Sequence, residues 1–289
     1  MLVPNLLCEI GFTKEEQETY CYYKNMIGGT VDEPARKYMH GITSFEETVE
    51  SLNCECINKY TLHLLFLLEC TSYLLDNYTL KGIDRSIFVD SMRDIKYKLD
   101  ECKRVKGVFG TFVVNWYKGF FEMTRFALGR LQYDVTVHQV ETLEIGGYIM
   151  QEGDFELNCH IPSAGPLTRK KVTDSLKRAY NFFNDRLKDG ILPVRCNSWL
   201  LFPPYSEVFG ETSNTLDFVR NFKIYSITEK DEFGDAWRVF NTHYDGDVAK
   251  LPSETTMQRS FINYIANGGT FGTAKGIILF DGEKILTKE

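Results

Sequence analysis

A histidine, several small residues and a run of cations lie close together in one short segment of the chain. His160 is followed by Ser163, Ala164 and Gly165, which are small enough for a ligand to approach the backbone. Thr168 then offers a side-chain oxygen that can cap the first turn of a helix. Because the free N–H groups of a helix N-terminus favour an anion, the segment predicts a phosphate site.

Three consecutive basic residues strengthen this prediction. Arg169, Lys170 and Lys171 occupy helix positions that usually carry acids. The positive end of a helix dipole repels exposed cations by roughly 0.3–1 kcal/mol each. A bound diphosphate or triphosphate would reverse the sign of this interaction, so the segment is a candidate site for a coenzyme pyrophosphate. The alternative is that three long side chains extend into water on an acidic protein.

A strand and a helix must hold this segment in place. Apolar side chains at every second position predict a half-buried strand that ends near Pro162. Apolar side chains three or four positions apart predict a helix after Thr168. The strand positions are Phe155, Leu157, Cys159 and Ile161, and the helix positions are Val172, Leu176, Ala179, Phe183 and Leu187. The local structure is therefore predicted to be strand, short loop and helix.

The amino-acid composition and net charge argue against some classes of protein. The 289 residues include 33 Lys and Arg and 40 Asp and Glu, which gives a net charge of −7. This balance argues against a nucleic-acid or anionic-membrane binder, which would need a basic face. The N-terminal segment has no basic leader or cleavage site, and no apolar run is long enough to span a bilayer. We therefore expect a cytoplasmic protein.

Cysteine and histidine spacing predicts no metal site. The chain has 8 cysteines, of which only Cys54 and Cys56 lie close together, and its 5 histidines are dispersed. Neither a zinc pair at C-x-x-C spacing nor a compact disulfide framework is present. We expect reduced and mostly buried thiols.

Helical patterns dominate residues 1–122. Thr13 with Glu16, and Ser44 with Glu47, have the spacing of capping boxes. Residues 58–78 are apolar on most faces and predict a central helix, and a further helix is expected from Asp84 to about residue 103.

Strands dominate residues 123–289, and no flexible linker separates the two parts, so we expect two domains packed on each other. The expected elements are a hairpin of 143–150 with 155–161, a strand at 191–202, a helix at 213–222, a strand pair of 223–227 with 237–240, a helix after Pro252, and a final hairpin over 276–286 around Asp281-Gly282.

Several motifs resemble a known family. They are GRLQY (129–133), HIPSAGPLT (160–168), CNSWLLFP (196–203), SNTLDFVRNF (213–222) and LPSETTMQR (251–259). The chain is similar to two-domain acyltransferase-like proteins that join a helical N-acyltransferase N-terminal domain to a GNAT-like C-terminal domain. The resemblance implies an α+β protein in which a helical domain, 1–122, packs on a mixed-sheet domain, 123–289.

The resemblance also implies a coenzyme site. In GNAT enzymes acyl-coenzyme A lies along the end of the fourth strand, here 155–161, and its pyrophosphate binds the following loop. The positions implied to bind acetyl-coenzyme A or another acyl-coenzyme A are Cys159, Ile161, Ser163, Ala164, Gly165, Thr168, Arg169 and Lys170. The chain departs from the usual loop, because a single glycine remains and Pro166 lacks an N–H donor.

Acyl transfer needs a base, donors for the oxyanion and an acid for the leaving thiolate. His160 is the expected base, since it ends the strand and its ordinary pKa lies near neutrality. Tyr205 is the expected acid by analogy of position. The alternatives are that His160 fastens the loop and that Tyr205 only packs. Arg130 is expected to bind an anion or, as we favour, to join the domains.

Three functions remain open. The first is transfer of an acyl group to a small-molecule amine. The second is an inactive GNAT-shaped binding or regulatory protein, and the third is a thioester hydrolase. An open gap between the strands that end near Ile161 and Cys196, lined by an ionisable group, would distinguish them. The sequence does not indicate the acceptor, the acyl length or the oligomeric state.

Overall fold

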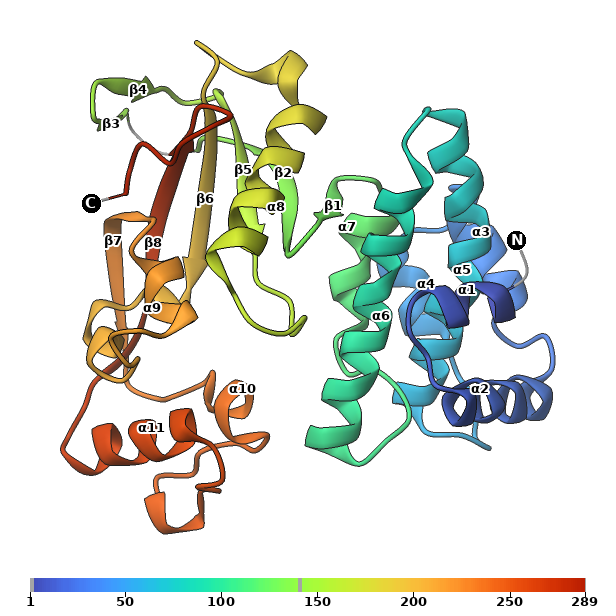
Figure 1. The fold of residues 1–289 in the computed structure, drawn as a ribbon. Helices are drawn as coiled ribbons and strands as arrows, with labels where there is room; N and C mark the ends of the chain where they lie inside the picture. Colours follow the sequence, from blue (N-terminus) through green and yellow to red (C-terminus); the bar gives the residue numbers. More distant parts are fainter. Residues whose placement is uncertain (1–2, 140–141, 289) are drawn as a thin grey trace. The chain divides into compact units, whose positions relative to one another are not determined.

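The computed structural model describes residues 3–139 and 142–288. It divides into two compact parts, which we call the helical unit, Met1–Ala127, and the sheet unit, Leu128–Glu289. Each is described by itself (Figure 1). A helical N-terminal region and a mixed C-terminal sheet were both predicted, and the structure confirms this fold class. Within the described residues, no helix combines the length and the apolarity needed to cross a membrane.

The helical unit is built around one long apolar helix. Its elements are α1 (Val3–Glu9), α2 (Lys14–Ile27), α3 (Asp32–Met39), α4 (Phe45–Ser51), α5 (Lys59–Leu80), α6 (Arg85–Lys106), η1 (Val114–Tyr117) and α7 (Lys118–Phe121). In α5 the five successive residues from Leu64 to Leu68 are at most 1% exposed. Since consecutive residues point in all directions around a helix, α5 is covered on every side. This confirms the predicted central helix.

Capping boxes fix the starts of α2 and α4. Glu16 accepts from the backbone N–H of Thr13 at 2.9 Å, while the Thr13 hydroxyl accepts from the N–H of Glu16 at 3.2 Å. Ser44 and Glu47 make the same reciprocal contacts. Both predicted boxes are confirmed, and each satisfies two N–H groups that the helix would otherwise leave unpaired.

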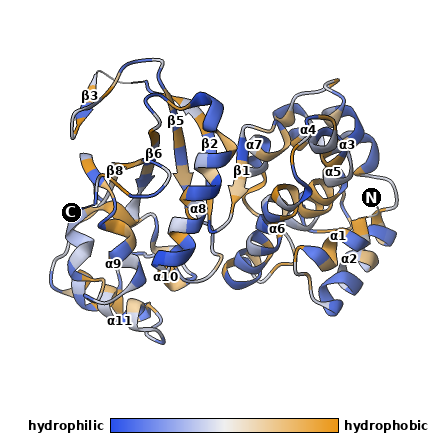
Figure 2. Ribbon diagram, turned by 45° about the horizontal axis from the view of Figure 1, so that its top comes forward, coloured by the Kyte–Doolittle hydropathy of each residue, from blue (hydrophilic) through white to orange (hydrophobic). Residues whose placement is uncertain are grey.

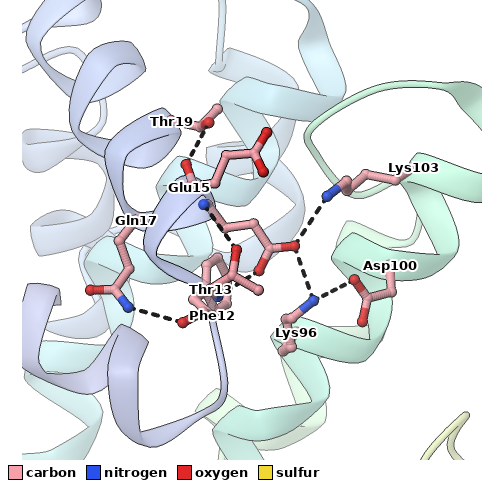
Figure 3. A network of polar contacts seen from close by, with 9 residues as sticks. Phe12, Thr13, Glu15, Gln17, Thr19, Lys96, Asp100 and Lys103 are labelled. Carbon is pink, nitrogen blue, oxygen red and sulfur yellow. Dashed lines mark hydrogen bonds and ion pairs between the residues drawn. The ribbon is translucent and has the colours of Figure 1, made fainter.

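A buried carboxylate links α2 to α6. Glu16 is 4% exposed. Its Oε1 lies 3.0 Å from Lys96 Nζ and 3.1 Å from Lys103 Nζ, and Lys96 also contacts Asp100 (Figure 3). Burial by itself would raise the pKa of Glu16, but the Thr13 N–H and the two ammonium groups outweigh it and hold the pKa below its usual range.

We predict that Glu16→Gln lowers the free energy of unfolding by about 1–3 kcal/mol, because two cations lose their charged partner. Glutamine still completes a capping box, so the loss reports the charge. Glu16 stabilises the fold when ionised, above the ordinary glutamate pKa of about 4.3, and this contribution disappears as the pH falls through the lowered folded-state pKa. Urea unfolding should therefore show the difference at neutral pH and a smaller one in acid.

The exposed Glu15→Gln is the matched control. A Glu16 variant that unfolds like the Glu15 variant at neutral pH would contradict the assignment.

The sheet unit contains most of a mixed sheet, whose edge strand β1 begins before the unit boundary at Leu128. In the described residues this sheet has six strands in the order β1-β2-β5-β6-β8-β7, and β3 and β4 form a separate pair. The strands are β1 (Arg125–Leu128), β2 (Leu131–Val137), β3 (Leu143–Ile145), β4 (Tyr148–Met150), β5 (Phe155–His160), β6 (Leu192–Ser198), β7 (Lys223–Lys230) and β8 (Phe271–Phe280). Of the pairings with a defined register, β5 with β6 is parallel and the others are antiparallel.

The remaining elements of this unit are helical. They are α8 (Arg169–Phe182), η2 (Asn184–Arg186), η3 (Trp199–Leu201), η4 (Pro203–Glu207), α9 (Asn214–Val219), α10 (Ala236–Phe240), η5 (Val248–Lys250) and α11 (Thr256–Ala266). The predicted helices over 213–222 and after Pro252 are confirmed as α9 and α11. In Figure 2 the central strands are mainly hydrophobic in colour and α8 is mainly hydrophilic.

The predicted hairpin of 143–150 with 155–161 is wrong. β3 pairs with β4, whereas β5 pairs with β2 from Gln132–His160 to Val137–Phe155. Gly146 and Gly147 have φ of 57° and 84°. Two successive residues with positive φ make the tight turn that joins adjacent antiparallel strands, so they close β3 onto β4.

The predicted strand at 237–240 is also wrong. These residues belong to α10, and β7 pairs instead with β8. Ala236, Val239 and Phe240 are the buried residues of α10, at positions i, i+3 and i+4. This is helical spacing.

The predicted final hairpin is found only in part. β8 is a single strand to Phe280, and the turn around Asp281-Gly282 is present. Beyond the turn the chain makes an isolated bridge, Phe280 with Ile285, and one further backbone bond from Leu286 to Leu279.

Candidate functional site

The pairing register of β2 and β5 sorts their side chains onto two faces. Directly opposed residues share a face, so Tyr133 and Cys159 lie together on one side, and Asp134, Asn158 and His160 lie on the other. The first face is packed by α8, because Tyr133 Oη lies 3.0 Å from Ser175 Oγ on that helix. The second face therefore carries the polar groups.

The two parallel strands part at their C-terminal ends. Within the described residues β5 and β6 are registered at two positions, Leu157 with Val194 and Asn158 with Arg195. Beyond them β5 continues to His160 paired with β2, and β6 continues to Ser198 paired with β8. The two strands are thus not registered with each other near Ile161 and Cys196, although the Cys159 and Cys196 thiols still hydrogen-bond across them. The open gap that the sequence analysis required stays a prediction.

His160 lies at this open end and is oriented by a carboxylate. Its Nε2 is 2.7 Å from Asp134 Oδ2 and 3.1 Å from Asn158 Nδ2. Both the His160 and Asp134 side chains are 23% exposed, so a substrate can approach them. A carboxylate only accepts, so we assign the donated proton to Nε2. The Asn158 amide nitrogen is also a donor, so its 3.1 Å contact with Nε2 is then not a hydrogen bond. The neutral ring then keeps its lone pair on Nδ1, where it can accept a proton.

A buried arginine holds the loop that follows. Arg130 is 8% exposed and donates to the carbonyl oxygens of Pro162, at 3.0 Å, and Gly165, at 2.7 Å. Gly165 has φ +84°, with open space where a Cβ would lie. The carbonyl groups are thus turned toward Arg130, which places a positive charge beside the loop. Arg130 therefore fastens this loop within its own unit.

The helix after the loop begins as predicted. The Thr168 hydroxyl accepts from the N–H of Lys171 at 3.4 Å, which caps α8. Arg169 binds Asp217 of α9 through both ends of its guanidinium, at 2.7 and 3.2 Å. This hydrogen bond lowers the pKa of Asp217. Lys170 and Lys171 are exposed on the first turn.

Cys159 and Ile161 place their side chains in the core. Cys159 is 2% exposed, and its hydrogen bond to Cys196, together with burial, raises the pKa of its thiol well above the usual range. Ile161 packs against a buried apolar cluster that includes Phe202 and Tyr205. Any ligand contact at Cys159 would therefore use the backbone, whereas the Ile161 side chain is only partly buried.

Tyr205 lies inside the same cluster. It is 0% exposed, and its ring centroid is 5.1 Å from those of Phe202 and Phe261. Burial raises the pKa of its hydroxyl. This placement favours packing, and a role for Tyr205 as the acid stays a prediction.

Sequence reasoning did not identify Asp134, or a second ionic group on the same face. Glu156, 2% exposed, lies 2.8 Å from Arg195 Nε and 3.2 Å from His138 Nδ1. Residues 156, 158 and 160 alternate along β5, so a polar stripe leads to His160. The alternation was visible in the sequence, but its partners required the strand register. Among the described residues no cluster of three or more potential metal ligands occurs.

We predict that Asp134→Ala abolishes the preference of neutral His160 for the Nε2–H tautomer, because the proton loses its acceptor. Nitrogen NMR of the imidazole above its titration range measures the two tautomers directly. Asp154→Ala removes a carboxylate that binds Lys188 at 2.7 Å and should leave the His160 signal unchanged. An even tautomer mixture in the wild type would contradict the assignment.

Solved structures of similar fold include two that carry acyl-coenzyme A ligands. An acyltransferase mutant in complex with octanoyl-CoA has a TM-score of 0.73 and 19% identity, covering 94% of this chain and 86% of that one. An acyltransferase in complex with decanoyl-CoA and teicoplanin has a TM-score of 0.71 and 18% identity, covering 95% and 86%. At this identity the likeness supports the fold. Comparison with curated proteins finds no significant match.

Family comparison covers nearly the whole chain. The N-acyltransferase N-terminal domain matches residues 1–123, and the GNAT-like C-terminal domain matches residues 126–278. The second match alone spans more than half of the chain. The chain therefore belongs to the two-domain N-acyltransferase family, in which a helical N-acyltransferase N-terminal domain precedes a GNAT-like C-terminal domain.

Proposed function

We propose that this protein is an acyl-coenzyme A dependent N-acyltransferase that acts on a small-molecule amine. The observation that carries the proposal is the parting of β5 and β6 directly beside the His160–Asp134 pair. A donor lying in that gap would bring its thioester next to an oriented base. The similar structures with octanoyl-CoA and decanoyl-CoA support this class of donor.

The coenzyme would bind from the gap toward α8. Its pantetheine amides can pair with backbone groups that β5 and β6 leave unpaired with each other. The pyrophosphate would lie at the loop 163–168, where the N-terminus of α8 and the nearby guanidinium of Arg130 both favour negative charge.

The acyl group need not be acetyl. The similar structures hold eight- and ten-carbon acyl groups, and one holds teicoplanin as well. We therefore propose a donor range that includes medium-chain acyl-coenzyme A.

The chemistry follows from the position of His160. The amine nitrogen attacks the thioester carbonyl, a C–N bond forms, and the C–S bond breaks to release the coenzyme A thiolate, which takes up a proton from water. His160 would take the proton from the attacking nitrogen at Nδ1, and Asp134 would stabilise the imidazolium. Backbone N–H groups near Cys159 and His160 are the proposed donors for the oxyanion.

We predict that His160→Gln lowers kcat for amine acylation at least about 100-fold, since general-base catalysis contributes typically that much. The affinity for octanoyl-CoA should stay within about threefold, because the side chain does not bind the pyrophosphate. Release of coenzyme A thiol from octanoyl-CoA, with a panel of amines and without amine, measures turnover. Calorimetric titration measures donor binding.

The alternatives give different results in the same assay. Thiol release that is independent of amine would identify a hydrolase. Donor binding without turnover on any amine would favour a binding or regulatory protein. Failure to bind octanoyl-CoA, acetyl-CoA and coenzyme A alike would overturn the proposed function.

We predict that Lys170→Glu with Lys171→Glu weakens coenzyme A binding about tenfold, because two charges are reversed within the first turn of α8. Arg169 is left intact because Asp217 already holds it. The control is Lys177→Glu, which reverses a charge farther along α8. In the wild type Lys177 Nζ lies 3.6 Å from Glu283 Oε2. Equal affinity in the double variant and the control would mean that Lys170 and Lys171 form only a solvated face.

A further inference from the structure

Two thiols meet in the segment that joins α4 to α5. Cys54 Sγ lies 3.1 Å from Cys56 Sγ, within hydrogen-bonding distance. Cys56 is exposed and Cys54 is half-exposed. Both sulfur atoms are therefore accessible to a dissolved reagent and are already close to each other. The acyl-transfer chemistry proposed above uses neither of them.

The surroundings of this pair favour two-thiol chemistry over metal binding. Structural zinc needs four ligands, and a catalytic zinc needs three from the protein. Among the described residues no group of three potential ligands forms, although Glu55 lies between the two cysteines. A dithiol without further ligands can instead exchange with a disulfide in solution.

We propose that Cys54 and Cys56 form a reversible dithiol–disulfide couple, a redox modification site in the helical unit. The oxidant is a small-molecule disulfide such as glutathione disulfide. An exposed disulfide that closes so short a segment is easily reduced again. The couple thus responds to the ratio of thiol to disulfide around the protein.

The exchange has two steps. The thiolate of Cys54 attacks one sulfur of glutathione disulfide, forming a mixed disulfide and releasing one glutathione thiolate. Cys56 then loses its proton and attacks the Cys54 sulfur, which forms the Cys54–Cys56 bond and releases the second glutathione. The two protein thiols are oxidised, and one glutathione disulfide is reduced to two glutathiones.

The hydrogen bond between the thiols sets this order. Either sulfur can be the donor in this contact, and the contact raises the pKa of the Cys56 thiol, which disfavours its thiolate. Cys54 is then the sulfur that attacks, and Cys56 is the one that resolves the mixed disulfide. Because the two sulfurs already lie in contact, the second step is intramolecular and fast.

The other cysteines provide internal controls. Cys8 and Cys21 are exposed, whereas the remaining four are buried. The buried residues are Cys70, Cys102, Cys159 and Cys196. A double variant, Cys8→Ser with Cys21→Ser, therefore leaves Cys54 and Cys56 as the accessible thiols.

The test incubates the full chain in buffers of set glutathione to glutathione disulfide ratio, followed by alkylation and peptide mass spectrometry. We expect the wild type and the Cys8/Cys21 variant to lose two hydrogens at the 54–56 segment without keeping glutathione. Cys56→Ser should trap glutathione on Cys54. Cys54→Ser should likewise trap glutathione, on Cys56, because no second thiol remains to resolve the mixed disulfide. Added dithiothreitol should restore both wild-type thiols.

Two results would overturn the proposal. In the first, Cys8 and Cys21 take up glutathione while the pair stays reduced. In the second, the wild type accumulates glutathione on Cys54 or Cys56 without closing the ring, as isolated surface thiols would.

Discussion

The site depends on one change of hydrogen-bond partner in the middle of the sheet. β5 and β6 pair in parallel as far as Asn158 and Arg195, after which each strand keeps only its antiparallel neighbour, β2 or β8. A buried strand normally satisfies its backbone groups on both edges. Beyond this point neither strand is registered with the other along its inner edge. The loop at 162–168, the start of α8 and His160 all lie at the same end because β5 delivers them there.

Register decides which residues can act at that end. Successive residues of a strand point to opposite faces, so β5 sends Leu157 and Cys159 into the core and Asn158 and His160 to the polar face. A slip of one residue against β2 would bury His160 and expose Cys159. The Tyr133–Ser175 contact on one face and the His160–Asp134 contact on the other both require the observed register. Core packing and site geometry are therefore specified together.

The sequence predicted the helices and strands better than it predicted which strands pair with each other. The capping boxes at Thr13 and Ser44, the central helix α5 and the order of strand, loop and helix around His160 all follow from neighbouring residues. Strand pairing depends on distant residues, and Gly146-Gly147 closed a hairpin that was assigned elsewhere. Asp134 was missed for the same reason, since it lies 26 positions from His160 along the chain.

The electrostatics of the loop show that the predicted phosphate site was argued from charges that the protein itself already neutralises in part. The cationic triplet suggested an anion because three positive side chains at a helix start repel the dipole. Arg169 relieves that repulsion through Asp217, without any ligand. The sequence indicated Arg130 as an anion-binding residue or a link between the domains, and the structure shows a buried guanidinium that fastens the loop by two carbonyl oxygens. A charge in a partly dry site is screened less than an exposed one. Arg130 and the helix terminus should therefore outweigh the exposed lysines in attracting a pyrophosphate.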